Sequence, residues 1–179
     1  MPNTFELIAS STVGAGGASF IDFTSIPSTY TDLVIYLSAR GAGSAAVTYV
    51  SARLNGSSSA IYSHVELYAE SSTPASAKDS SQTYIYTLGH IPANTATAST
   101  FGNTEIYIPN YAGTSNKSLS AAGVAENNSG SNGAWTVSMT AGGAALTSEI
   151  TSIRLVVGSN GSTNFMQYST AYLYGVKNA

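Results

Sequence analysis

The chain has 179 residues, of which only 8% are charged, and its formal net charge is -3 with a pI of 5.1. That length is enough for one domain, spanning residues 1–179, to bury a core without support from a metal or a disulfide. The slight negative charge offers no basic surface to phosphates or anionic lipids, so we expect no nucleic acid and no membrane partner. Cysteine is absent, which excludes disulfides and thiol nucleophiles.

A surface with so few charges gives little colloidal repulsion. Much of it is therefore expected to be covered by other copies of the chain or by partner proteins. Residues 1–30 show no basic start followed by a long apolar run, and no segment reaches the ~18 apolar residues of a membrane span. We accordingly expect neither an export signal nor membrane insertion.

Short apolar runs separated by Gly, Ser, Asn and Pro clusters predict an all-β fold. We expect an antiparallel β-sandwich, jelly-roll-like, with about 8 to 11 short strands. The predicted strands are 5–9, 19–23, 32–39, 47–54, 63–69, 83–88, 104–108, 118–125, 134–140, 152–157 and 170–176. Polar composition predicts loops at 71–81, 112–116 and 126–133.

Two of these strands alternate apolar and polar residues in the way expected when one face meets a core and the other meets water. The apolar sets are Leu33, Ile35 and Leu37 in strand 32–39, and Trp135, Val137 and Met139 in strand 134–140. Three Asn-Gly pairs, which favour the positive φ angles of tight hairpins, predict turns. They are Asn55-Gly56, Asn132-Gly133 and Asn160-Gly161.

Two histidines are present, and one of them has a neighbour of chemical interest. His64 and Glu66 would share one face of a strand and supply two metal ligands, but no third ligand stands at a recognisable spacing. A packed or solvated pair is the favoured interpretation. His90, in the segment Leu88 to Pro92, is interpreted as a turn residue. We expect no metal and no cofactor.

Catalytic motifs are also missing from the sequence. No Gly-x-Ser-x-Gly elbow and no ordered triad is present, so the protein is not expected to be an enzyme. Glu66, Glu70 and Glu105 are the only acids that a fold might pair for glycoside hydrolysis. Ordinary surface charge is the favoured interpretation for them.

Tyrosine is over-represented, with 12 residues, several of which are spaced two apart as in Tyr84 and Tyr86 or Tyr172 and Tyr174. Three interpretations remain open. Aromatic residues favour strands in general. Exposed tyrosines also suit a protein interface, because they bury a large area at small entropic cost. Stacking on sugar rings is the third possibility.

An ordered series of short patterns runs along most of the chain. The series begins with a first strand, an Ile-Pro-x-x-Tyr-x-x-Leu pattern and an arginine, and it closes with a Tyr-Gly-Val-Lys segment. Its residues are Thr4-Phe5-Glu6-Leu7-Ile8, Ile26-Pro27-Ser28-Thr29-Tyr30-Thr31-Asp32-Leu33, Arg40, Arg53-Leu54-Asn55-Gly56, Tyr62 and Tyr174-Gly175-Val176-Lys177. This series resembles a family of small all-β virion proteins of tailed bacteriophages.

The resemblance implies a non-enzymatic structural protein of the virion. Of the roles in that family, decoration or cementing of the capsid is favoured, because the chain lacks the heptads and collagen-like repeats of an extended fibre. The expected partners are the major capsid protein and other copies of the chain, with a trimer implied by the resemblance. The protein would be made in the host cytoplasm and reside on the capsid exterior. A head-fibre or tail-associated module that binds host glycans is the alternative.

Charge is scarce enough to make the arginines conspicuous. Arg40 and Arg53 each follow an apolar strand segment. A partly buried arginine would fix the relative placement of strands by bidentate pairing with Asp22, Asp32 or Glu66. We therefore expect a structural role for both arginines, and structural or interface roles for Tyr62, Tyr84, Tyr86, Tyr172 and Tyr174.

Overall fold

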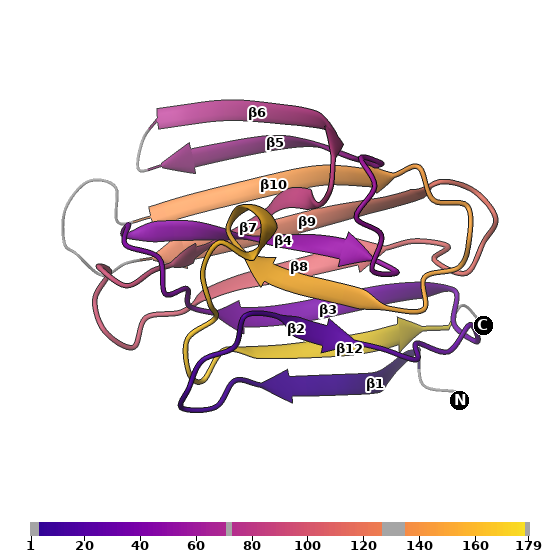
Figure 1. Cartoon of the computed structure of the whole chain (residues 1–179), viewed down its shortest axis with the longest axis horizontal. Helices are drawn as coiled ribbons and strands as arrows, with labels where there is room; N and C mark the ends of the chain where they lie inside the picture. The colour runs from indigo at the N-terminus through magenta and orange to yellow at the C-terminus, as the bar shows by residue number, and fades with distance from the viewer. Residues whose placement is uncertain (1–3, 71–72, 127–134, 178–179) are drawn as a thin grey trace.

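Twelve strands form two antiparallel sheets that pack face to face in the computed structural model, which describes residues 4–70, 73–126 and 135–177 (Figure 1). Eight strands form the larger sheet, in the order β1, β12, β3, β8, β9, β10, β5, β6, and four form the smaller sheet, in the order β2, β11, β4, β7. The predicted antiparallel β-sandwich is confirmed. Within the described ranges the one helical element is a short 3-10 turn, Ser159–Gly161, and no helix is long and apolar enough to span a membrane.

The strands have the following bounds: β1 Phe5–Thr12, β2 Ile21–Phe23, β3 Asp32–Ala39, β4 Val47–Leu54, β5 Tyr62–Glu70, β6 Thr73–Gln82, β7 Ile85–Pro92, β8 Gly102–Ile108, β9 Lys117–Glu126, β10 Trp135–Ala144, β11 Ile153–Val157 and β12 Thr170–Val176. Each predicted strand overlaps one of them. β3, β4 and β12 match the prediction at both ends.

One predicted loop is wrong, because most of segment 71–81 belongs to strand β6. β6 is the last strand of the larger sheet, and β5 is the one described strand with which it pairs. In Figure 1 it extends beyond the smaller sheet, and its side chains are exposed on both faces. A strand in that position needs no apolar alternation, so its polar sequence gave no strand signal.

The Asn-Gly turns have a different outcome from the one predicted. Asn55-Gly56 and Asn160-Gly161 do adopt positive φ angles. Neither closes a hairpin, because the strands that they separate belong to different sheets. Asn132-Gly133 and the predicted loop 126–133 lie outside the described residues, apart from Glu126 at the end of β9.

The hydrophobic core lies between the two sheets. As predicted, Leu33, Ile35 and Leu37 of β3 point inward and are almost fully buried. They join the inward residues of the neighbouring strands in one cluster with the smaller sheet. Tyr62 is completely buried, and its hydroxyl accepts from the Leu54 N–H (3.1 Å) and donates to the Leu54 carbonyl (3.0 Å).

Strand β10 has the opposite orientation to the one that its alternation predicts. Thr136, Ser138 and Thr140 point into the sandwich and are buried, whereas Val137 and Met139 face outward. The inward residues lie against β7, which presents Thr87, Gly89 and His90 in that part of the interior. The prediction that the apolar side faces the core is therefore wrong for this strand. Pairing with β5 extends the same reversal to that strand.

The reversal can be tested with two leucines of the larger sheet. Leu33→Ala should lower the free energy of unfolding by about 2–5 kcal/mol, because it opens a cavity in the core. Leu67→Ala, at an exposed position of β5, should change it by less than about 0.5 kcal/mol in dilute solution. Urea unfolding followed by circular dichroism measures both. Equal losses would contradict the orientation of β5.

Candidate functional site

The outward face of the eight-stranded sheet is the most unusual surface of the described structure. Strand register places its side chains in rows that cross the sheet, and most members of these rows are apolar or uncharged. One row runs in order through Tyr172, Tyr36, Glu105, Ala122, Met139 and Leu67. We call this surface the outer face.

Branched and long aliphatic side chains gather on β5 and β10, a region that we call the aliphatic end. Val65, Leu67, Val137 and Met139 are exposed by 52%, 61%, 52% and 65%. An isolated exposed leucine is ordinary, but four large apolar side chains on two adjacent strands form a contiguous patch. Such a patch typically marks an interaction surface.

A groove follows β9 beside the aliphatic end. The outward side chains of β9 include Ser120 and Ala122, which are small, whereas the flanking strands carry Tyr107 and Met139. The resulting hollow, of about 350 Å3, is lined largely by apolar atoms from β5, β8, β9 and β10. The outer face therefore has a groove over β9, bordered by the larger side chains of β8 on one side and of β10 on the other.

The opposite side of the outer face is aromatic, and we call it the aromatic end. Phe5 and Leu7 of β1 are exposed by 48% and 52%, and Tyr36 and Tyr172 by 42% and 40%. Tyr174 meets Tyr36 edge to face, with ring centroids 5.9 Å apart. Of the tyrosines predicted to form an interface, Tyr172 and Tyr174 thus lie together on this surface.

Charged groups on the central strands of the outer face are few. Asp32 is buried and accepts hydrogen bonds from the Tyr107 hydroxyl (2.6 Å) and the Asn110 backbone N–H (2.8 Å). Glu105 lies beside Tyr36 in the row. Partial burial of the phenol, followed by the charge of Glu105 and its hydrogen bond, raises the pKa of Tyr36. Tyr36 is therefore neutral at physiological pH and suits an uncharged interface.

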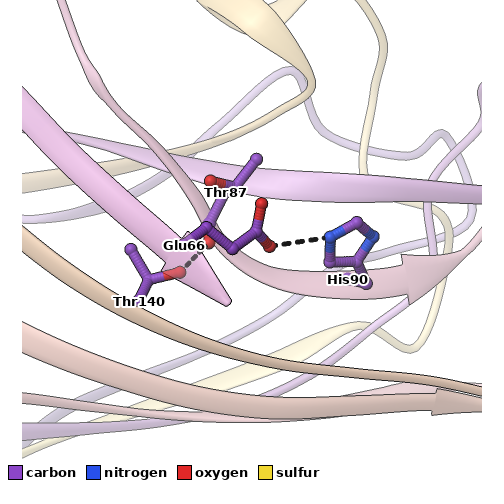
Figure 2. A network of polar contacts seen from close by, with 4 residues as sticks. All are labelled: Glu66, Thr87, His90 and Thr140. Carbon is purple, nitrogen blue, oxygen red and sulfur yellow. Dashed lines mark hydrogen bonds and ion pairs between the residues drawn. The ribbon is translucent and has the colours of Figure 1, made fainter. Parts of the chain in front are cut away.

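Polar groups are concentrated instead inside the sandwich, under the aliphatic end (Figure 2). The His90 Nε2 atom lies 2.8 Å from Glu66 Oε1, and both side chains are buried. The Thr140 hydroxyl donates to the Thr87 carbonyl at 2.5 Å. His90 is part of β7 and links it to β5, so its interpretation as a turn residue is wrong.

His64 and Glu66 share the inner face of β5, as predicted, but they do not form a ligand pair. Glu66 is bonded to His90, and the Nδ1 atom of His64 has no protein partner. Burial lowers the pKa of His64 from its ordinary value of 6.5, against smaller opposing effects of Asp79 and Glu66. In the part of the chain that the structure describes, no three His, Asp or Glu residues are grouped to hold a metal ion.

The three acids considered for glycoside hydrolysis are not brought together. Glu66 points into the sandwich, whereas Glu105 is on the outer face of the same sheet. Glu70 is exposed at the end of β5. A glycosidase needs both carboxyl groups on the same side, flanking one sugar bond, so this trio does not provide that geometry.

Arg40 is buried and has a structural role, but its partners are not the predicted carboxylates. Its guanidinium donates to the carbonyls of Ala96 (2.8 Å), Thr97 (2.7 Å) and Thr100 (3.1 Å). Desolvation lowers its pKa from the ordinary value. These three carbonyls belong to the loop that connects β7 and β8, and Arg40 directly follows the end of β3. Arg40 therefore fixes the position of this loop relative to β3.

Arg53 also lacks the predicted carboxylate partner among the described residues. Its Nε donates to the Thr83 carbonyl (3.3 Å), and its guanidinium lies 4.0 Å from the centre of the Tyr84 ring. Tyr84 is buried beneath it, and Tyr86 is half-buried, with its hydroxyl donating to the Asn160 side chain (3.3 Å). Tyr62 and Tyr84 are thus internal residues, unavailable to a partner.

Asp22 is paired with a different arginine, which the sequence did not single out. Arg154 of β11 binds Asp22 of β2 through two hydrogen bonds, of 2.8 and 2.6 Å, and lies 4.0 Å from the centre of the Phe20 ring. The bidentate pairing expected of an arginine is therefore present, but across the smaller sheet. In the sequence Arg154 alternates with the apolar residues Ile153 and Leu155. This pattern indicates an outward side chain but gives no information on which strand lies beside it.

Comparisons with protein-family models, with curated proteins and with solved structures give no match to this chain. The resemblance to virion proteins of tailed phages, and the roles that it implies, therefore stay predictions.

Burial of His64 predicts a pH dependence of stability. Below about pH 6.5 the unfolded chain binds a proton at His64 that the folded protein, with its lowered pKa, does not. The free energy of unfolding should consequently fall as the pH decreases through about 6.5, by about 1.4 kcal/mol for each unit of pKa lowering. His64→Gln should reduce this fall in urea titrations at several pH values. An identical pH profile in the variant would contradict the assignment.

The arginine contacts predict unequal effects of two conservative substitutions. Arg40→Lys should lower the free energy of unfolding by about 2 kcal/mol or more, because an ammonium group cannot reach the carbonyls of Ala96, Thr97 and Thr100 together. Arg53→Lys is the matched control and should cost less than about 1 kcal/mol, since it keeps the charge above an aromatic ring. Similar losses in the two variants would argue against a specific role of the Arg40 contacts.

Proposed function

We propose that this protein is a non-enzymatic structural component of a tailed-phage virion that decorates the capsid exterior. The observation that carries the proposal is the outer face, where large apolar and aromatic side chains cover a sheet that, among the described residues, has no second layer on that side. The resemblance in sequence supplies the virion context. The protein is made in the host cytoplasm and binds the major capsid protein, which it stabilises in the assembled shell.

The aromatic end is the proposed contact with the shell. Tyr36, Tyr172 and Tyr174 present large rings with few rotatable bonds, so they bury area with a small loss of entropy. The nearest carboxylate, Glu105, is engaged with Tyr36. Binding through such a surface depends weakly on salt, because few ions are displaced or screened. Each bound copy favours the assembled shell over free subunits by mass action.

A receptor-binding module of a head fibre or tail is the alternative, and the opposite face of the sandwich favours it. There Phe20, beside β2, is 42% exposed and stacks with Arg154. Tyr86 of β7, at the other edge of the same sheet, is hydrogen-bonded to Asn160 of the 3-10 turn. Aromatic rings beside amide and guanidinium groups provide the apolar and hydrogen-bonding contacts that a sugar requires.

The shell proposal predicts a gain in particle stability. Added to shells that lack it, the wild-type protein should raise their melting temperature in calorimetry. Tyr36→Ser/Tyr172→Ser should weaken binding roughly thirtyfold or more, as expected from the loss of central aromatic contacts. Tyr168→Ser, at an exposed tyrosine outside the sheets, is the control and should bind normally.

Two results would decide against this function. Shells that melt at the same temperature with and without the protein would exclude a cementing role. Binding of the isolated protein to host cells, reduced by Phe20→Ser but not by Tyr36→Ser/Tyr172→Ser, would establish the receptor-binding alternative. Cryo-electron microscopy of intact particles locates the protein independently, on the shell or at the tail.

A further inference from the structure

The geometry of the aliphatic end points to a second copy of this chain as its partner. We propose that two copies pair face to face about a two-fold axis that lies parallel to β10, midway between the two facing sheets. This contact is separate from the aromatic end, and the inference does not depend on a role in a virion. It would create a symmetric dimer whose two aromatic ends lie on opposite sides of the contact.

The first support is the self-complementary shape of the surface. β5 and β9 are the two neighbours of β10 in the sheet. β5 carries a ridge, formed by Val65 and Leu67, whereas β9 is the floor of the groove. A rotation of 180° about this axis places β5 of each copy over β9 of the other copy. Each ridge then enters the groove of its partner.

The strand register shows which residues of the two copies face each other. Leu67 shares a row with Met139 and Ala122, and Val65 shares the next row with Ala141 and Ser120. An axis along the strand direction keeps each row in place. Leu67 of one copy therefore lies over Ala122 of the other, so a large side chain meets a small one. Met139, on the axis, packs against its own counterpart.

The charges that flank the patch are complementary under the same rotation. β8 and β6 are both two strands from β10, on opposite sides, and so come to face each other. Glu105 of one copy lies over Ser76 of the other, in the row of Leu67, and Lys78 follows one row further along β6. Successive rows are about 6.6 Å apart, within the reach of a lysine side chain. Opposite charges thus meet at both edges of the contact.

The area available is that of a small interface, the class in which weak and transient associations fall. Five strands about 4.8 Å apart and about 20 Å long provide on the order of 500 Å2 in each copy. The pair buries about 1,000 Å2 in total, at the lower end of specific interfaces. We therefore expect a reversible dimer in the micromolar range. The facing sheets would lie about 10 Å apart, as in other sheet packings.

Sedimentation equilibrium of the full chain tests the pairing. The wild-type protein should show a monomer–dimer equilibrium in the micromolar range. Met139→Glu should weaken it at least a hundredfold, because two carboxylates would meet on the axis. Leu7→Glu introduces the same charge at the aromatic end and should leave the equilibrium unchanged. Circular dichroism and melting curves confirm that both variants are folded.

Cross-linking tests the register, and the absence of cysteine in the chain makes it direct. Met139→Cys should give a covalent dimer with a short bis-maleimide, whereas Leu7→Cys should not. A mixture of Leu67→Cys and Ala122→Cys proteins should cross-link more efficiently than either protein alone, because these positions face each other only between copies.

Several outcomes would overturn the inference. A wild-type protein that remains a monomer throughout the micromolar range excludes the pairing. A mass of three copies supports the trimer implied by the sequence resemblance and contradicts the two-fold arrangement. Cross-linking of Leu7→Cys in preference to Met139→Cys would move the contact to the aromatic end. None of these measurements involves shell binding, so the dimer and the virion role are tested separately.

Discussion

The two sheets of this sandwich differ in width, and the rest of the structure follows from that mismatch. A sheet with an apolar face is stable only when a second layer removes that face from water. The four-stranded sheet covers one face of the eight-stranded sheet, and no other described element covers the opposite face. On β3 the large apolar residues point toward the cover, but on β5 and β10 they point away from it. The protein therefore has more apolar sheet surface than a single copy buries.

The sequence predicts most strands and the pairing of residues on each face, because alternation is a local property. It does not predict which face is inward. For β3 the expectation that the more apolar face points inward is correct, since Leu33 and Ile35 are fully buried. For β10 the decision depends on β7, which is 50 residues away and brings His90 and Thr87 into the interior. The spacing of Val137 and Met139 within β10 therefore cannot indicate which face of the strand packs against β7.

Scarcity of charge explains why the predicted arginine partners were wrong. Arg40 uses backbone carbonyls in place of a carboxylate, which needs no second charged residue. In the described residues the ion pairs join strands of distant sequence: Arg154 to Asp22, and Lys177 to Glu6. These pairs stabilise the connection between the first and last strands and the adjacent edge of the smaller sheet. The outer face carries few charges, and two of them, Glu105 and Lys78, lie at the edges of the proposed contact between copies.

Strand β12 lies between β1 and β3 and is hydrogen-bonded to both, with the Lys177 N–H reaching the Thr4 carbonyl at 2.9 Å (Figure 1). During synthesis β1 and β3 leave the ribosome long before the strand that joins them. Until translation has passed residue 176, the edges of β1 and β3 that pair with β12 remain unpaired. The nascent chain therefore exposes unpaired strand edges, which promote aggregation, until β12 has emerged.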